Sequence, residues 1–147
     1  MPLVFSYGKL TFEEVRSFLL VTDNEFPTPL SARVDIDAYA KKLSEFSEFS
    51  ICRDGEDIIG MISCYTNRPP IGYISNACIK RMYQAQKVFS RLFRQLKAYS
   101  RIQGILRFQL EVDANNDKAR RIYEHYGFRV LSINRETSKS LMELVLD

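Results

Sequence analysis

A carboxylate and a phenol lie twelve residues apart near one predicted turn of the chain, Glu111 and Tyr123. Residues 108–112 alternate between apolar and polar side chains, which predicts a strand with Glu111 on its polar side. Tyr123 falls on the apolar face of a short predicted helix that begins after a capping Asn116 and ends at Gly127. A strand end and an adjacent helix can present these side chains to one cleft, as a candidate general base and a candidate general acid.

The stretch from Asn116 to Phe128 reads N-x-x-A-x-x-x-Y-E-x-x-G-F. This motif resembles the end of the acyl-CoA fold in the GNAT superfamily of N-acetyltransferases. The resemblance implies an α/β (α+β) acyl-CoA N-acyltransferase fold with a mixed sheet of about seven strands and about four helices. It further implies an enzyme that takes its acyl group from acetyl-CoA and uses no metal.

The resemblance also implies roles for the two side chains. Tyr123 occupies the position of the tyrosine that protonates the leaving thiolate in many family members. Ribosomal-protein alanine acetyltransferases carry a glutamate at the offset of Glu111, where it serves as general base. Alternatives stay open: Tyr123 packs in the core, Glu111 forms a salt bridge, or the amine loses its proton through a water relay without a single base.

Periodicity and cap signals predict the element order β-α-α-β-β-β-α-β-α-β-β, in which antiparallel strands precede βαβ units. With 147 residues we expect a single domain, 1–147. The predicted strands cover residues 3–7, 49–53, 57–65, 73–79, 105–112, 128–133 and 141–146. The predicted helices follow Thr11, begin at Asp35 or Asp37, run from Val88 to about Gly104, and follow Asn116.

The loop before the long helix is the predicted cofactor site. In the family it reads Q/R-x-x-G-x-G/A, and its amides hold the pyrophosphate. Gln84 matches the first position, whereas Lys87 and Phe89 replace both glycines. Phe89 either crowds the phosphates or turns into the core, and the amides still serve if φ stays negative, as in a first helical turn. By resemblance, the cofactor-binding residues are Ile79, Lys80, Arg81, Gln84, Ala85, Gln86, Lys87, Val88, Phe89 and Asn116.

The loop of residues 23–33 is expected to meet the acceptor, although an ordinary surface loop is the alternative. Its acids suit a cationic amine and its phenylalanine suits packing, while the strand 73–79 offers polar groups for substrate or water. The candidate acceptor-binding residues are Asp23, Glu25, Phe26, Tyr73 and Ser75. Residues 26–43 are similar to a loose group of bacterial GNAT proteins associated with surface-sugar gene clusters, which favours a small-molecule amine such as an amino sugar. The offset of Glu111 from Tyr123 favours a protein N-terminus instead.

Charge is unevenly distributed along the chain. The net charge is +3, yet no Asp or Glu lies between Asp57 and Glu111, an interval with nine basic residues. A positive middle favours a polyanionic ligand such as coenzyme A. A nucleic-acid binder would need a recognition motif that we do not find, so no nucleic-acid partner is expected. A GNAT-like binding module without catalysis remains an alternative, because both loop glycines are replaced.

Further sequence features concern thiols, metal binding, cellular location and assembly. Cys52, Cys64 and Cys78 lie in apolar stretches and predict buried free thiols. His125 is the only histidine, so no zinc spacing exists. No apolar run spans a membrane and the start lacks a signal-peptide pattern, so we expect a cytoplasmic protein without a membrane partner. The C-terminal strand SLMELVLD is expected to be able to pair across a homodimer.

Overall fold

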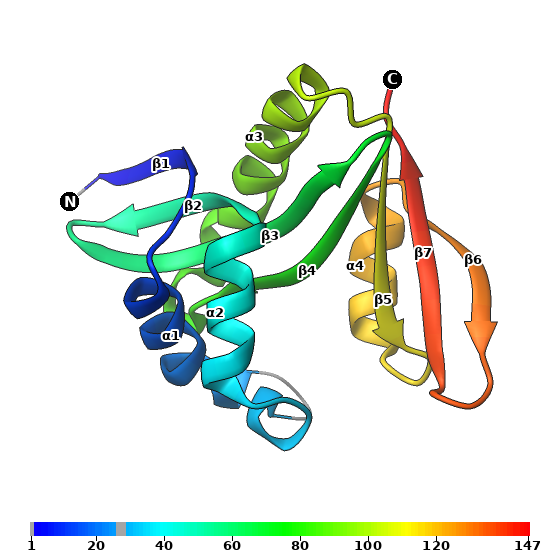
Figure 1. Cartoon of the computed structure of the whole chain (residues 1–147), viewed down its shortest axis with the longest axis horizontal. Coiled ribbons are helices and arrows are strands. Elements are labelled where there is room, and N and C mark those ends of the chain that lie inside the picture. Colours follow the sequence, from blue (N-terminus) through cyan, green and yellow to red (C-terminus); the bar gives the residue numbers. More distant parts are fainter. Residues whose placement is uncertain (1, 26–28) are drawn as a thin grey trace.

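The chain alternates strands and helices in the predicted order, and the computed structural model describes residues 2–25 and 29–147 (Figure 1). The strands are β1 (Leu3–Gly8), β2 (Glu48–Asp54), β3 (Asp57–Arg68), β4 (Ile71–Ile79), β5 (Arg107–Asp113), β6 (Arg129–Asn134) and β7 (Lys139–Val145). The helices are α1 (Phe12–Val21), α2 (Ile36–Phe46), α3 (Val88–Ile102) and α4 (Asp117–His125). Three short 3-10 helices are η1 (Asp23–Glu25), η2 (Leu30–Ala32) and η3 (Arg81–Gln86).

All seven strands form one mixed sheet in the order β1-β2-β3-β4-β5-β7-β6. Neighbours from β1 to β4 are antiparallel, β4 and β5 are parallel, and β7 pairs antiparallel with both β5 and β6. The predicted mixed sheet with a parallel centre and four helices is therefore confirmed.

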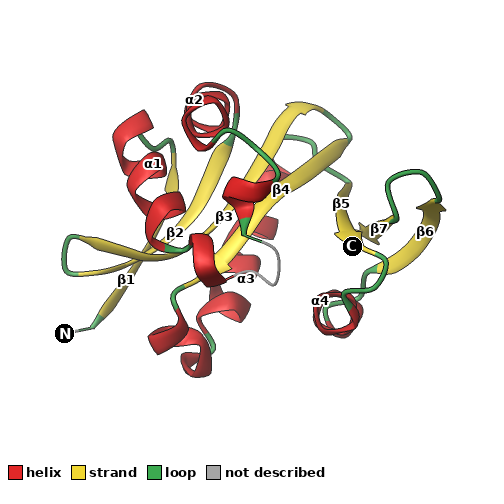
Figure 2. Ribbon diagram, turned by 90° about the horizontal axis from the view of Figure 1, so that it is seen from below, coloured by secondary structure: helices red, strands yellow, loops and turns green. Residues whose placement is uncertain are grey.

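The helices cover the sheet in two layers. Figure 2 shows α1 and α2 on one face and α3 and α4 on the other. One buried cluster joins α1 and α2 to the sheet through Phe18, Leu43 and Phe49, and the larger one joins α3 and the α4 side through Phe93 and Phe108. Each helix buries one apolar stripe against the sheet, which is the main stabilising contribution of such layers.

Local signals explain where the first helices begin. The Thr11 hydroxyl accepts from the Glu14 amide at 3.2 Å, and the Glu14 carboxylate accepts from the Thr11 amide at 3.0 Å, which completes a capping box. Asp35 rather than Asp37 caps α2, since its carboxylate accepts from the amides of Asp37 and Ala38. The β2–β3 hairpin turns at Gly55, where φ is +61°.

The central parallel pair separates soon after it forms. Only Ile71–Tyr73 of β4 pair with residues 107–109 of β5, and the two strands then diverge (Figure 1). The β3–β4 register also shifts: Ser63 faces Asn76 and Cys64 faces Ile74, so Ser75 is an additional residue on β4. This β-bulge lies beside the divergence, in the place where bulges re-aim side chains next to functional sites.

The structure corrects the expectation for the C-terminal strand. β7 pairs with β5 on one side and with β6 on the other, so both of its edges are occupied. It therefore has no free edge with which to pair across a dimer. The edge strand at this end of the sheet is β6, whose six residues are all exposed.

The three cysteines are free and buried, as predicted. Among the described residues, no helix is long and apolar enough to cross a membrane. The segment of residues 23–33 differs from the predicted plain loop, because η1 and η2 occupy part of it.

Candidate active site

Beyond Tyr73 and Gln109 the backbones of β4 and β5 no longer pair, and we call this divergence of the two strands the opening (Figure 1). On β5, Phe108, Leu110 and Val112 belong to the core under α3 and α4, so the alternating Gln109 and Glu111 face the α1–α2 side.

Glu111 meets β4 on the α1–α2 side. The Tyr73 hydroxyl donates a hydrogen bond of 2.9 Å to Oε1 of Glu111. Burial, followed by this contact with the carboxylate, raises the pKa of Tyr73 well above its usual range, so the phenol stays a donor. Glu111 itself is exposed. The structure thus brings together a predicted base and a predicted acceptor-binding residue, and places them at the opening.

Ser75, at the bulge, is held by α2. The Tyr39 hydroxyl lies 2.5 Å from Ser75 Oγ and donates to the Ser75 carbonyl at 3.1 Å. Burial, only partly offset by the hydrogen bond to Ser75, raises the pKa of Tyr39 to about 12. Tyr39 was not among the predicted site residues, since nothing local in the sequence links it to a strand far along the chain.

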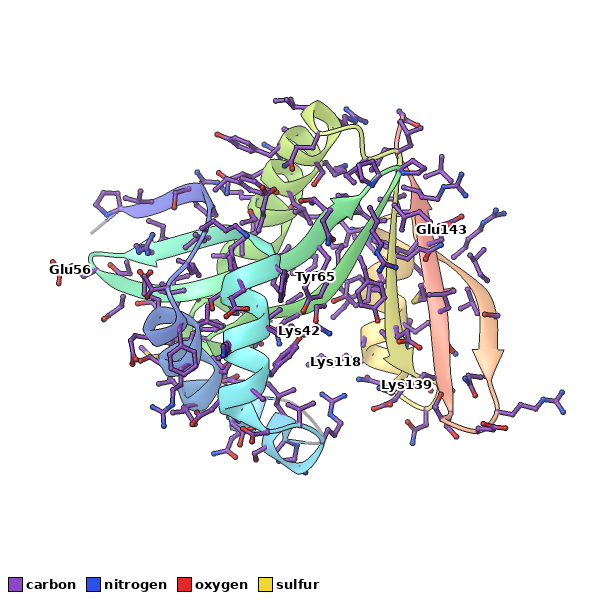
Figure 3. All side chains as sticks on the ribbon, viewed as in Figure 1. Lys42, Glu56, Tyr65, Lys118, Lys139 and Glu143 are labelled. Carbon is purple, nitrogen blue, oxygen red and sulfur yellow. The ribbon has the colours of Figure 1, made fainter. Side chains whose placement is uncertain are left out.

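Two buried polar atoms near the bulge lack partners. Within the described ranges, Tyr65 Oη and Asn76 Oδ1 are buried and make no hydrogen bond. The Lys42 ammonium lies 5.6 Å from the centre of the Tyr65 ring, and Figure 3 shows the two side chains together between α2 and β3. Unpartnered buried polar groups cost free energy and concentrate at functional sites. Tyr65 was not among the predicted site residues, whereas Asn76 is one of the polar residues of the strand 73–79 that were expected to serve substrate or water.

Tyr123 lies on the other face, under α4. Its ring packs edge-on against Phe89 of α3, with 6.1 Å between centroids, and against Phe128, at 5.5 Å. This dense packing, with a smaller contribution from the Cys78 thiol, raises the pKa of Tyr123 to about 12. The side chain is only partly buried, and in the described part of the chain its hydroxyl neither forms a hydrogen bond nor counts among the buried unpartnered atoms. The hydroxyl is therefore available to a ligand.

In the loop before α3, a lysine has the left-handed backbone conformation that glycine usually adopts. Lys87, the N-cap residue of α3, has φ +55° and ψ +26°, so the condition that φ stays negative fails at Lys87 but holds for Val88 and Phe89 in the first turn. The reason is geometric: the chain passes from η3 directly into α3, and the residue between them adopts the left-handed conformation. Among the side chains that the structure describes, none caps α3 at this position. The first amides of α3 therefore keep their hydrogen-bonding capacity for an anion.

Phe89 turns into the core, which was one of its two predicted positions. It packs against the larger buried cluster, and its ring centroid lies 5.1 Å from that of Tyr126, the C-cap residue of α4. Its backbone amide still belongs to the first turn of α3. Val88, beside it, is fully buried.

The remaining predicted cofactor residues make contacts within the chain. The Gln84 side chain donates to the Ile79 carbonyl at 3.0 Å, which ties η3 to the end of β4. The Arg81 guanidinium lies 3.7 Å from the Glu25 carboxylate. Asn116 Oδ1 accepts from the Ala119 amide at 3.1 Å and so caps α4.

Lys80, Ala85 and Gln86 complete the set of predicted cofactor-binding residues. The Lys80 side chain lines a separate groove between α1 and the β2–β3 hairpin, together with Glu13 and Asp57. The backbones of Ala85 and Gln86 belong to η3, and their side chains lie outside what the structure describes.

The loop of residues 23–33 forms more polar contacts within the chain than the sequence indicated. Asp23 accepts from the Ser31 amide at 2.9 Å and from the Ser31 hydroxyl at 2.6 Å, and these bonds lower the pKa of Asp23. Glu25 pairs with Arg81. Phe26 lies outside the described residues. Asp23 and Glu25 thus have partners within the chain, whereas Tyr73 and Ser75 are at the opening.

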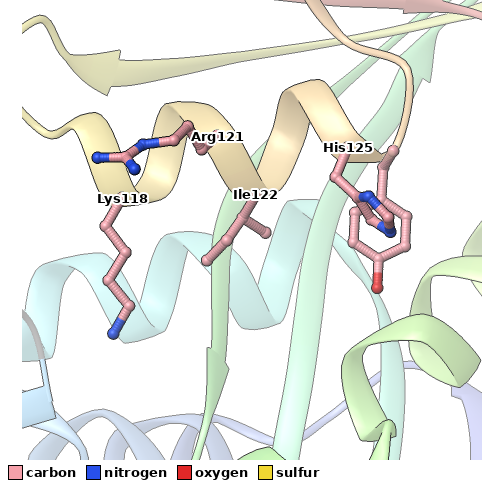
Figure 4. A pocket seen from close by; sticks show the side chains of 5 residues that line it. Lys118, Arg121, Ile122 and His125 are labelled. Atoms are coloured by element: carbon pink, nitrogen blue, oxygen red, sulfur yellow. The ribbon is translucent and has the colours of Figure 1, made fainter.

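A groove of about 510 Å³ runs along α4. Figure 4 shows Lys118 and Ile122 extending from one side of the helix, with His125 at its C-terminal end. The lining residues are Lys118, Arg121, Ile122, His125 and Tyr126. Tyr126, which lines this basic groove, also packs against Phe89 in the first turn of α3. The helical spacing of its members was visible in the sequence and could have indicated the groove.

The comparisons with known proteins agree with this architecture. The family model described as "Acetyltransferase (GNAT) family" matches residues 13–128. The chain therefore belongs to the GNAT acetyltransferase family. The sequence matches none of the curated proteins with which it was compared.

Solved structures share the fold at low identity. A GNAT-family acetyltransferase from Desulfovibrio desulfuricans has a TM-score of 0.80 at 16% identity, covering 99% of this chain and 100% of its own. The PaiA N-acetyltransferase of Thermoplasma acidophilum, solved with coenzyme A, has a TM-score of 0.76 at 16% identity, with 99% of each chain covered. An Escherichia coli ribosomal-protein alanine N-acetyltransferase has a TM-score of 0.77 at 15% identity, covering 99% of this chain and 95% of its own.

Proposed function

We propose that the chain is a cytoplasmic N-acetyltransferase that moves an acetyl group from acetyl-CoA to the primary amine of a small molecule. The observation that carries the proposal is the hydrogen bond of Tyr73 to Glu111 where β4 and β5 diverge, with Tyr123 packed against Phe89 on the opposite face of the sheet. A donor bound on the α3–α4 side and an acceptor bound on the α1–α2 side would meet in the opening.

The residues on the α3–α4 side fit coenzyme A. The uncapped first turn of α3 offers amides to a pyrophosphate, and the α4 groove adds Lys118 and Arg121 for further phosphate charge. When bound, acetyl-CoA supplies the thioester whose carbon–sulfur bond breaks as the new carbon–nitrogen bond forms.

Glu111 accepts the proton that the acceptor ammonium must lose before its nitrogen can attack. Tyr73 engages Oε1 of Glu111, so the second carboxylate oxygen is the one that takes this proton. Because Tyr73 remains protonated, it also keeps the carboxylate in place throughout the working pH range.

Tyr123 stabilises the departing thiolate. A phenol whose pKa is about 12 does not give its proton completely to a sulfur whose ordinary pKa is about 8.5. Its contribution is therefore a hydrogen bond to the developing negative charge, with the proton lost by the amine restoring neutrality.

The test is thermal unfolding with and without acetyl-CoA, followed by acetyl transfer to a panel of amino sugars and other small amines. Ligand at about 100 times its Kd adds about 2.7 kcal/mol. For a domain of this size the Tm should rise by roughly 5–10 °C. An unchanged Tm would indicate a GNAT-like module that no longer binds the cofactor.

Acetylation of a protein N-terminus is the second candidate. The twelve-residue offset between Glu111 and Tyr123 supports it, because the resemblance places a glutamate base there in ribosomal-protein alanine acetyltransferases. Parallel kcat/KM measurements on short peptides and on small amines distinguish the two candidates. A clear preference for peptides would replace the small-molecule proposal.

A further inference from the structure

Aromatic side chains connect the N-terminal half of α3 with α4. The ring of Phe93 lies 5.4 Å from that of Tyr126, and the ring of Phe89 lies 5.1 Å from Tyr126 and 6.1 Å from Tyr123, measured between centroids. Figure 1 shows the two helices well separated on the same face of the sheet, so these rings fill the space between them.

Phe89 belongs to two parts of the site at once. Its backbone amide lies in the uncapped first turn of α3, where the resemblance implies pyrophosphate binding. Its ring forms one wall around Tyr123, and Phe128 forms another at 5.5 Å between centroids. Both contacts are edge-on, with interplanar angles of 67° and 70°, an arrangement that aromatic quadrupoles favour.

With a glycine at position 89, the Tyr123 ring would lose one of the two aromatic rings that pack edge-on against it. The ring would then have space to rotate about its side-chain bonds, and water could reach the part that Phe89 now covers. The residue that departs from the family loop pattern is thus the residue that restricts the candidate acid.

We propose that Phe89 is a positioning residue, which fixes the orientation of the Tyr123 ring, and with it the direction of its hydroxyl, and which links this orientation to the phosphate-binding turn. The inference rests on the proposed function. It assigns a role to Phe89, whose replacement of the family's glycine would otherwise indicate impaired cofactor binding.

The first experiment compares Phe89→Leu with the wild type. Leucine keeps apolar volume but removes the flat edge, so we expect kcat to fall about tenfold to a hundredfold, as small misplacements of catalytic groups do. The KM for acetyl-CoA should stay within about twofold, because the amides of the turn remain. A loss confined to that KM would overturn the proposal.

The matched control is Tyr99→Leu. Tyr99 is on the same helix and also forms an aromatic pair, with Tyr7 at 4.3 Å between centroids, but at the other end. Its loss should lower the Tm without lowering kcat. An equal fall of kcat in both variants would show that general destabilisation of α3 is responsible.

A double-mutant cycle with Tyr123→Phe separates positioning from other effects of Phe89. If Phe89 acts through the Tyr123 hydroxyl, adding Phe89→Leu to Tyr123→Phe should change kcat by less than about twofold. Additive losses would overturn the proposal.

A titration without substrate separates this inference from the proposed function. The phenolate signal that disappears in Tyr123→Phe identifies Tyr123. At pH 10, where the protein is still folded, this phenolate should be a larger fraction in Phe89→Ala than in the wild type, because entering water lowers the raised pKa of Tyr123. An equal phenolate fraction in both proteins overturns the role of Phe89 even in an active enzyme. Absent turnover and an unchanged Tm with acetyl-CoA in the wild type would instead overturn the proposed function.

Discussion

The hydroxyl of Tyr73 donates a 2.9 Å hydrogen bond to Oε1 of Glu111, and this bond joins β4 to β5 beyond the last backbone pair between the two strands. Where the backbones of β4 and β5 no longer pair, the side chains of Tyr73 and Glu111 provide one polar contact between the strands. The strands can thus remain apart while the carboxylate keeps a defined position. Disrupting either partner should change catalysis more than folding, since Glu111 is exposed.

Replacing Glu111 by Gln should lower kcat at neutral pH and flatten the rise of rate with pH, because an amide cannot accept the ammonium proton. The measurement is the pH dependence of kcat/KM for both proteins. Tyr73→Phe is the matched control, since it leaves the carboxylate but removes its hydrogen bond. This control should lower kcat while keeping the rising limb. A Glu111→Gln profile with wild-type shape would favour proton loss through a water relay.

Tyr123→Phe should reduce kcat by about tenfold to a thousandfold, the range for the loss of one donor to a developing charge. The KM for acetyl-CoA should hardly change, because the ring and its aromatic neighbours remain. Steady-state kinetics with varied acetyl-CoA checks both statements. An unchanged kcat would remove Tyr123 as the hydrogen-bond donor to the thiolate.

Lys87→Gly should stabilise the protein by about 0.5–1 kcal/mol. A left-handed residue other than glycine costs about 1–2 kcal/mol, and the greater chain entropy of glycine offsets part of the gain. Lys87→Ala keeps the strain and removes only the charge, so it should leave the Tm unchanged. If the ammonium contacts phosphate, both variants should raise the Kd for acetyl-CoA equally. Denaturant unfolding and calorimetric titration give the two quantities, and a lower stability of Lys87→Gly would refute the strain argument.

Alkaline pH should unfold the protein earlier than an average domain. Tyr39 and Tyr123 have pKa values of about 12 in the folded state, against about 10 when unfolded. A raised folded pKa contributes stability that is complete below pH 10 and is lost as pH rises towards 12. The Tm measured from pH 8 to 12 should fall steeply above about 10. Tyr39→Phe should reduce that slope, and a slope equal to the wild type would show that Tyr39 does not contribute.

The sequence by itself determined the order of elements, most of their ends and the family. Thr11, Asp35 and Asn116 each satisfy helix amides within three residues, and the alternation of residues 108–112 marks both faces of β5. These are local relations, which a linear chain displays directly. For the same reason the elements that carry Glu111 and Tyr123 could be predicted.

The tertiary structure alone decided which side chains meet. Tyr73 and Glu111 are 38 residues apart, and Tyr39 and Ser75 are 36 apart, so no periodicity connects them. It also decided that Glu111 and Tyr123 lie on opposite faces, that β7 is internal, and that Lys87 is left-handed. Each of these features depends on how helices and strands pack against one another, because strand pairing and helix junctions are set by contacts between segments distant in sequence.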